Sequence, residues 1–153
     1  MAHYNWGYPN IVWFGNGRIN KLPNACNIFN IKKPLLVTDK DLATTTMVAK
    51  AIEINKKNSL PTKIFSDLKG NPLGINVQKG VEEFKRGGHD GVIAFGGGSS
   101  LDVGKSIALL VSHDRPLWDF AGDGSFWNKN DYVESMAKNK IDNPDKVKPI
   151  IAI

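Results

Sequence analysis

A run of three glycines between a strand pattern and a helical pattern is the feature that most restricts how this chain can fold. Residues 91–95 are short, apolar and partly β-branched, which is typical of a buried strand. Gly96, Gly97 and Gly98 follow directly, and residues 99–112 repeat apolar side chains at helical spacing. The N–H groups at the start of such a helix are free, and glycine lets a ligand approach them closely. The segment therefore predicts an anion site suited to a pyrophosphate.

Two plainer explanations of the same segment stay open. Ser99 and Asp102 have the spacing of a capping box, which any helix can use. Three glycines can also serve only to make a tight turn between a strand and a helix. The G-x-G-x-x-G pattern of many dinucleotide-binding proteins fits at Gly96 and Gly98 but fails at Leu101. The pattern thus favours an anion site without identifying the anion.

The remaining segments alternate between strand and helix patterns. Strands are predicted at 11–14, 34–38, 63–65 and 147–153, and helices at 41–57, 73–86 and near 132–138. This alternation is typical of a parallel sheet with helices on both faces. We expect a Rossmann-like α/β fold that forms one dinucleotide-binding domain over residues 1–153. Because the chain stops inside an apolar strand pattern, we expect the domain to be truncated at its C-terminal edge.

Asp39 directly follows the strand predicted at 34–38. The carboxyl ends of parallel strands share one edge of a sheet, so Asp39 is expected near the glycine turn. An acid there can accept hydrogen bonds from an adenosine ribose, and its charge repels a 2′-phosphate, which favours NAD over NADP. The same residue can equally cap the helix that follows. Its position alone leaves the two roles even.

These motifs resemble the iron-dependent (group III) alcohol dehydrogenase family. The resemblance rests on Phe14-Gly15-Asn16-Gly17, Val37-Thr38-Asp39, Asn71-Pro72, and residues 96–102 with Lys105. It implies an NAD-dependent oxidoreductase that transfers a hydride between the cofactor and a small alcohol or aldehyde. It also implies that this chain is the nucleotide-binding half. The divalent metal, iron or zinc, would be held by one Asp and three His of an all-helical domain that is missing here, so the chain alone is expected to be inactive.

The resemblance also assigns cofactor contacts to eight residues of this chain. Asp39 would hold the adenosine ribose, and Asn71 would contact the adenosine end. Gly97, Gly98 and Ser99 would cradle the pyrophosphate, whereas Ser100, Leu101 and Asp102 would lie towards the nicotinamide end. No catalytic residue and no metal ligand is expected in the chain, because His3, His89 and His113 match no ligand of the family.

Composition narrows the partners and the location. The net charge is +5, but the 20 basic residues are scattered and mostly lysine, which argues against nucleic-acid binding. We expect no membrane association and a cytoplasmic protein, because no apolar run is long enough to span a bilayer and no signal pattern is present. Cys26 is expected to be a buried, unreactive thiol in a reducing compartment. Apolar strands at 11–14 and 149–153 predict self-association into a homo-oligomer such as a dimer.

Two alternatives to this enzyme remain at this point. The chain can be a non-catalytic nucleotide-binding or interaction module of the same fold. The whole protein can also be a related metal-dependent dehydrogenase that acts on glycerol or on a dehydroquinate-type substrate. The sequence does not separate these, because most substrate contacts would lie beyond residue 153.

Overall fold

The central sheet has four strands among the described residues, and two of them are apolar and buried at every position. The structure is a computed structural model, and it describes residues 11–114, 116–120 and 147–153. Its strands are β1 (Pro34–Val37), β2 (Lys63–Phe65), β3 (Gly91–Ala94) and β4 (Ile150–Ala152). Its helices are α1 (Leu22–Ile28), α2 (Lys40–Ala43), α3 (Thr46–Lys57), α4 (Gly74–Gly87) and α5 (Gly98–Leu110), with 3₁₀ turns η1 (Arg18–Lys21) and η2 (Leu117–Phe120).

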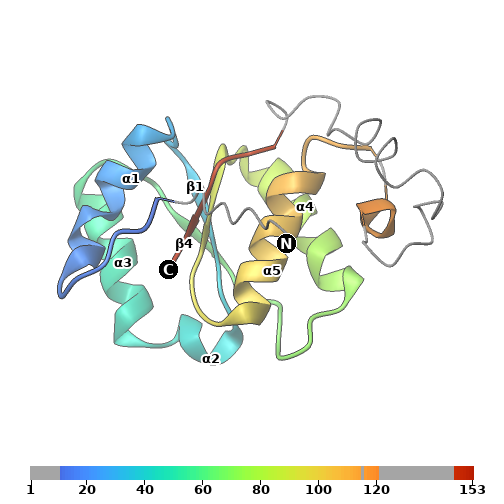
Figure 1. Cartoon of the computed structure of the whole chain (residues 1–153), viewed down its shortest axis with the longest axis horizontal. Coiled ribbons are helices and arrows are strands. Elements are labelled where there is room, and N and C mark those ends of the chain that lie inside the picture. The colour runs from blue at the N-terminus through green and yellow to red at the C-terminus, as the bar shows by residue number, and fades with distance from the viewer. Residues whose placement is uncertain (1–10, 115, 121–146) are drawn as a thin grey trace, which may run out of the picture.

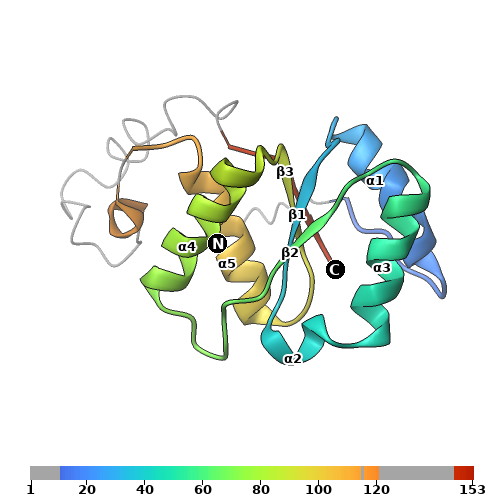
Figure 2. The ribbon, with the colours of Figure 1, turned by 180° about the vertical axis from the view of Figure 1, so that it is seen from behind.

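The strands form one parallel sheet in the order β2-β1-β3-β4. Helices α1 and α3 cover one face of this sheet, and α4 and α5 cover the other (Figure 1 and Figure 2). From β1 the chain continues outward to β2, whereas from β3 it continues in the opposite direction to β4. The direction in which successive strands are added across the sheet therefore reverses between β1 and β3, although the strands themselves run parallel. The predicted parallel α/β fold with helices on both faces is confirmed.

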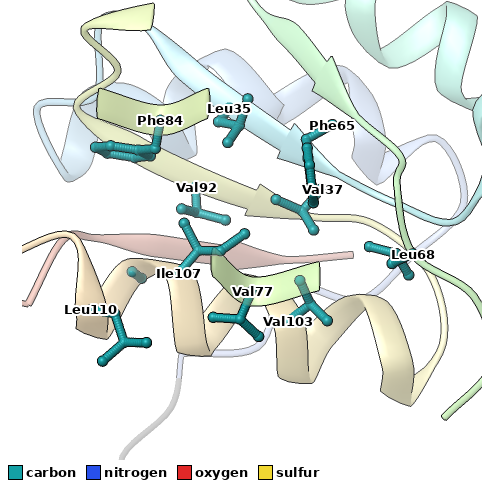
Figure 3. Close-up of a cluster of buried hydrophobic side chains, with 11 residues drawn as sticks. Leu35, Val37, Phe65, Leu68, Val77, Phe84, Val92, Val103, Ile107 and Leu110 are labelled. Carbon is teal, nitrogen blue, oxygen red and sulfur yellow. The ribbon is translucent and has the colours of Figure 1, made fainter. Parts of the chain in front are cut away.

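Two clusters of buried side chains hold the helices to the sheet. Leu35, Val37 and Val92 point to the face of α4 and α5, where they join the cluster drawn in Figure 3. Leu36 and Ile93 belong to the second cluster, on the face of α1 and α3. Because successive side chains of a strand point to opposite faces, burial of both faces makes β1 and β3 apolar at every position. This explains the continuous apolar runs in the sequence.

A glycine brings α5 unusually close to the sheet. A Cβ on Gly104 would lie 2.7 Å from Cβ of Ala94 and 3.4 Å from Cγ1 of Val92. Any side chain at position 104 would therefore push α5 away from β3. Since α5 begins at the glycine turn, this contact also fixes the turn against the sheet.

The strand predicted at 11–14 is wrong. This segment has no strand structure, and Ile11, Val12 and Phe14 are exposed. A strand is stable only when it pairs along its length and covers an apolar face. Among the described residues, segment 11–14 pairs with neither edge of the sheet, so its apolar side chains alone do not make it a strand.

The single helix predicted at 41–57 is also wrong, because two helices occupy this stretch. The break falls at Thr44 and Thr45, whose hydroxyls bond to the local backbone. Thr45 Oγ1 donates to the carbonyl oxygen of Leu42 at 2.7 Å and accepts from the N–H of Val48 at 3.5 Å, so it caps α3. Threonine hydroxyls compete in this way with the helical backbone. Met47, which was expected in the buried stripe, is 56% exposed.

The other strands and helices predicted within the described ranges are confirmed, and their ends differ from the prediction by three residues at most. The segment 73–86 is α4, and Gly88 ends it with a left-handed φ of 60°. The segment 147–153 contains β4. Cys26 is fully buried, and burial raises the pKa of its thiol to about 11, as expected for an unreactive cysteine. The helix predicted near 132–138 and His3 lie outside the described residues.

No helix in the described ranges combines the length and the apolar character that a membrane span requires.

Candidate functional site

A cavity of about 350 Å³ opens at the carboxyl ends of β2, β1 and β3. The segments that leave these three strands come together at one end of the sheet, where Figure 1 shows α2 and the start of α5. In an open parallel sheet, ligands bind at the point where the strand order reverses, which here is between β1 and β3, and the cavity lies at this point. Its walls are Asp39, Lys40 and Asp41 after β1, Leu68, Lys69 and Gly70 after β2, and Gly97, Gly98, Ser99 and Ser100 after β3.

The three glycines of the turn have different reasons to be glycine. Gly96 has a φ of 132°, and a Cβ there would lie 3.0 Å from Oγ of Ser100 and 3.1 Å from Cδ2 of Leu42. Gly97 and Gly98 have no positive φ, and a Cβ on either would meet no described atom within 4 Å. The tight turn therefore explains Gly96 alone. Beside Gly97 and Gly98 there is open space against the cavity, which a ligand can fill.

The N-terminus of α5 supplies hydrogen-bond donors at this position. Gly97 is the N-cap residue, no side chain caps it, and the N–H of Leu101 donates to the carbonyl oxygen of Gly97 at 3.1 Å. The N–H groups of the residues before Leu101 have no partner within the helix. Together with the positive end of the helix dipole, they make this end of the cavity suitable for an anion.

The capping-box explanation of the same segment is wrong. Ser99 lies inside the first turn of α5 rather than before it, and its side chain makes no capping bond. Asp102 is exposed, and its carboxylate lies 3.7 Å from the ammonium of Lys105. The sequence spacing matched the motif, but the helix begins two residues earlier than the motif requires.

Asp39 has the structural role that the sequence allowed, and it also faces the cavity. Its Oδ1 accepts a hydrogen bond of 2.8 Å from the N–H of Leu42, so it caps α2. The residue is half-buried and lines the cavity wall. The cap occupies one carboxylate oxygen, and no residue in the described part of the chain bonds to the second, which leaves it available to a ligand. Capping and ligand binding are therefore compatible at this residue.

The loop after β2 forms the third wall, and the sequence pointed to it only through the resemblance at Asn71-Pro72. Leu68 is buried, and Figure 3 shows it at the end of the apolar cluster near Val37 and Val103. The amide of Asn76 holds both ends of this loop: its Nδ2 donates to the carbonyl oxygen of Asp67 at 2.7 Å, and its Oδ1 accepts from the N–H of Leu73 at 2.8 Å. Within the sequence, the signal for this wall is Leu68, a lone apolar residue in the polar connection that follows the strand.

A small ion-pair network joins this loop to the neighbouring one. The Asp67 carboxylate receives the ammonium of Lys79 at 2.7 Å, and that of Lys40 lies 3.7 Å away. The hydrogen bond and charge of Lys79 lower the pKa of Asp67, and Lys40 adds to the effect. Lys40 lines the cavity, but its ammonium also interacts with the carboxylate of Asp67, which is not part of the cavity wall.

The structure brings together five of the eight predicted contact residues. Asp39, Gly97, Gly98, Ser99 and Ser100 line one cavity, although they come from two distant segments of the sequence. The other three, Asn71, Leu101 and Asp102, do not line it. Asn71 follows the lining residue Gly70 and is exposed with a φ of 53°. Binding of a cofactor by these eight residues stays a prediction.

The histidines and acids of the described residues do not form a candidate metal centre. Nowhere in the described ranges do three or more His, Cys, Asp or Glu side chains come together so that they could hold a metal ion. His89 is buried, with Nδ1 3.0 Å from the carbonyl oxygen of Lys33, and His113 packs against the ring of Phe120. We therefore derive no metal chemistry from these residues.

The fold and the cavity define a class of protein: a Rossmann-like α/β domain with a cavity suited to an anion at the point where the strand order reverses. The family of iron-containing alcohol dehydrogenases matches residues 9–153. The chain belongs to the iron-containing alcohol dehydrogenase family, which confirms the resemblance seen in its motifs.

Individual relatives match this chain over part of their own length. A 4-hydroxybutyrate dehydrogenase of Cupriavidus necator is 34% identical over 105 residues, which are 69% of this chain and 27% of the relative. The NADH-dependent butanol dehydrogenase B of Clostridium acetobutylicum is 30% identical over 125 residues, 82% of this chain and 32% of the relative. The crystal structure of a 1,3-propanediol oxidoreductase gives a TM-score of 0.75 at 32% identity, over 79% of this chain and 32% of that one. The chain thus spans about a third of the length of the curated relatives it matches.

Proposed function

We propose that this chain is the nucleotide-binding half of an NAD-dependent, metal-dependent alcohol dehydrogenase that transfers a hydride between NAD(H) and a small alcohol or aldehyde. The observation that carries the proposal is the cavity, with free helix N–H groups and two uncrowded glycines on one side and Asp39 on another. Family membership supports the reaction, since the relatives are named as dehydrogenases of 4-hydroxybutyrate and of butanol, and the second is named as NADH-dependent.

Each wall of the cavity has a part in holding the dinucleotide under this proposal. The backbone N–H groups at the start of α5 would donate charge-assisted hydrogen bonds to the diphosphate oxygens. The second carboxylate oxygen of Asp39 would accept from the hydroxyl groups of the adenosine ribose. Asn71 contacts the adenosine end at the rim, and Leu101 and Asp102 lie towards the nicotinamide. When bound, NAD accepts or gives up the hydride, and the protein orients it.

The metal and the location complete the proposal. We place the divalent metal, iron or zinc, in a helical domain that supplies one Asp and three His, and not on the residues described here. The chain on its own then binds the cofactor without turning over an alcohol. A cytoplasmic location is consistent with the buried free thiol of Cys26, which suits a reducing compartment.

Calorimetric titration of the chain with NADH and NADPH tests the cofactor and the role of Asp39. We expect NADH to bind and NADPH to bind more weakly, because the Asp39 carboxylate repels the 2′-phosphate. Asp39→Asn keeps an oxygen that can accept from the N–H of Leu42, so the cap of α2 survives while the charge is removed. This variant should narrow the preference by roughly tenfold, which corresponds to about 1.4 kcal/mol of repulsion.

The control variant is Glu82→Gln, which removes one exposed negative charge from α4, away from the cavity walls. Its NADH/NADPH preference should equal that of the unchanged chain. If the chain binds neither dinucleotide, the proposed function is wrong. If it binds NADH but Asp39→Asn leaves the preference unchanged, Asp39 does not contact the ribose.

A further inference from the structure

The charges on the cavity walls differ in whether the protein already compensates them. Lys40 and Lys69 are the basic residues of the walls. Lys40 shares the carboxylate of Asp67 with Lys79. Within the described ranges, no carboxylate lies at ion-pair distance from the ammonium of Lys69. Lys69 is therefore the positive charge of this cavity that is left for a ligand.

The backbone that carries Lys69 is held in place. Leu68, directly before it, is buried in the apolar cluster at 2% exposure. On either side, the amide of Asn76 bonds to the carbonyl oxygen of Asp67 and to the N–H of Leu73. Lys69 itself is exposed at the cavity wall. A fixed backbone and a long, solvated side chain suit a cation that closes onto a bound group.

A diphosphate at the start of α5 needs such a cation. The helix N-terminus offers only partial positive charge, about half a unit. Asp39 and Asp41, on the wall that follows β1, repel a negatively charged ligand. The loop after β2, the segment after β1 and the start of α5 line the same cavity. The ammonium of a lysine in the β2 loop can therefore reach the same ligand as the N–H groups of α5.

We propose that Lys69 binds a phosphate of the dinucleotide from the side opposite the N-terminus of α5. This inference rests on the proposed function and adds a residue that neither the sequence motifs nor the glycine turn indicated. Lys69 completes the anion site: the N–H groups of α5 bind one side of the diphosphate, and the ammonium binds the other. Lys40 contributes less, because Asp67 already compensates its charge.

The experiment measures the dissociation constants of three probes for the 153-residue chain and its variants at low salt. The probes are NADH, ADP-ribose, which keeps the diphosphate, and adenosine, which lacks it. Lys69→Gln should weaken NADH and ADP-ribose by roughly two- to fivefold, the usual effect of one exposed ion pair, and leave adenosine unchanged. In about 1 M salt, where the Debye length is about 3 Å, the difference should disappear.

Two further variants make the result specific. Lys85→Gln removes an exposed charge from the last turn of α4 and should bind every probe like the unchanged chain. Lys40→Gln should have a smaller effect than Lys69→Gln. Equal NADH affinity in Lys69→Gln, an equal loss for adenosine, or a larger effect of Lys40→Gln would overturn the role of Lys69 while the proposed function stands. No binding of NADH by the unchanged chain would overturn the proposed function itself.

Discussion

Replacing Gly98 by alanine should separate ligand binding from folding. Gly98 is the first residue of α5, and a Cβ there meets no described atom within 4 Å. Alanine is favoured over glycine inside a helix by roughly 1 kcal/mol, and by less at its first position. The free energy of unfolding of Gly98→Ala should therefore stay within about 0.5 kcal/mol of the unchanged chain, and its Tm within about 2 °C.

Binding should respond very differently. The new methyl group occupies the space through which a diphosphate reaches the N–H groups of α5. A hydrogen bond to a charged group contributes about 1.5–3 kcal/mol, so the loss of one raises the Kd for NADH by roughly ten- to a hundredfold. Gly98→Val should abolish binding. Calorimetry gives the Kd, and thermal unfolding followed by circular dichroism gives the Tm of the same samples.

Gly96→Ala is the matched control, because it should lose stability first. Its φ of 132° strains any side chain, and a methyl group there would lie 3.0 Å from Oγ of Ser100, which would have to shift. Such backbone strain costs about 1–3 kcal/mol, which lowers the Tm by several degrees. If Gly98→Ala binds NADH normally, the ligand does not approach this turn. If it loses as much stability as Gly96→Ala, all three glycines serve the turn, and the plainer explanation is right.

Two more predictions concern the chain as a whole. Burial lowers the pKa of His89, so the unfolded chain takes up a proton at this residue more readily than the folded chain does. The stability that depends on neutral His89 is therefore complete above its ordinary pKa of about 6.5 and is lost as the pH falls below that value. The urea midpoint should therefore fall between about pH 7 and 5, and His89→Gln should flatten this slope; a slope that does not change would contradict the assignment. The exposed side chains Ile11, Val12 and Phe14 should make the chain self-associate, which light scattering measures, and Phe14→Ser should weaken the association. A monomer at high protein concentration would show that this segment has no partner of its own kind.

Sequence reasoning succeeded where one segment contains its own signal. β1 and β3 are buried on both faces, so their apolar runs are continuous, and α4 carries its stripe and its terminal glycine in one stretch. It failed where structure depends on neighbours. The segment 11–14 is apolar enough for a strand but has no described strand beside it.

The candidate site shows the same division. The glycine turn and Asp39 were located because each directly follows an apolar strand. Lys69 was missed, because only the order of strands in the sheet places the loop after β2 beside β1. The sequence also did not separate the roles of Gly96 and Gly98, because glycine can be required either by a positive φ, as at Gly96, or by the open space that a ligand needs, as at Gly98.

The close contact between Gly104 and Ala94 has a consequence for the way a ligand would be bound. At Gly104 the backbone of α5 lies close against β3, and buried side chains of α5 pack on the sheet beside it, so the N-terminal donors of α5 are oriented before any ligand arrives. Their ordering is completed during folding, and association has to immobilise little more than the ligand and a few surface side chains. Recognition at this end of the cavity should therefore proceed as rigid-body docking, with backbone shifts of about 1 Å or less in the turn.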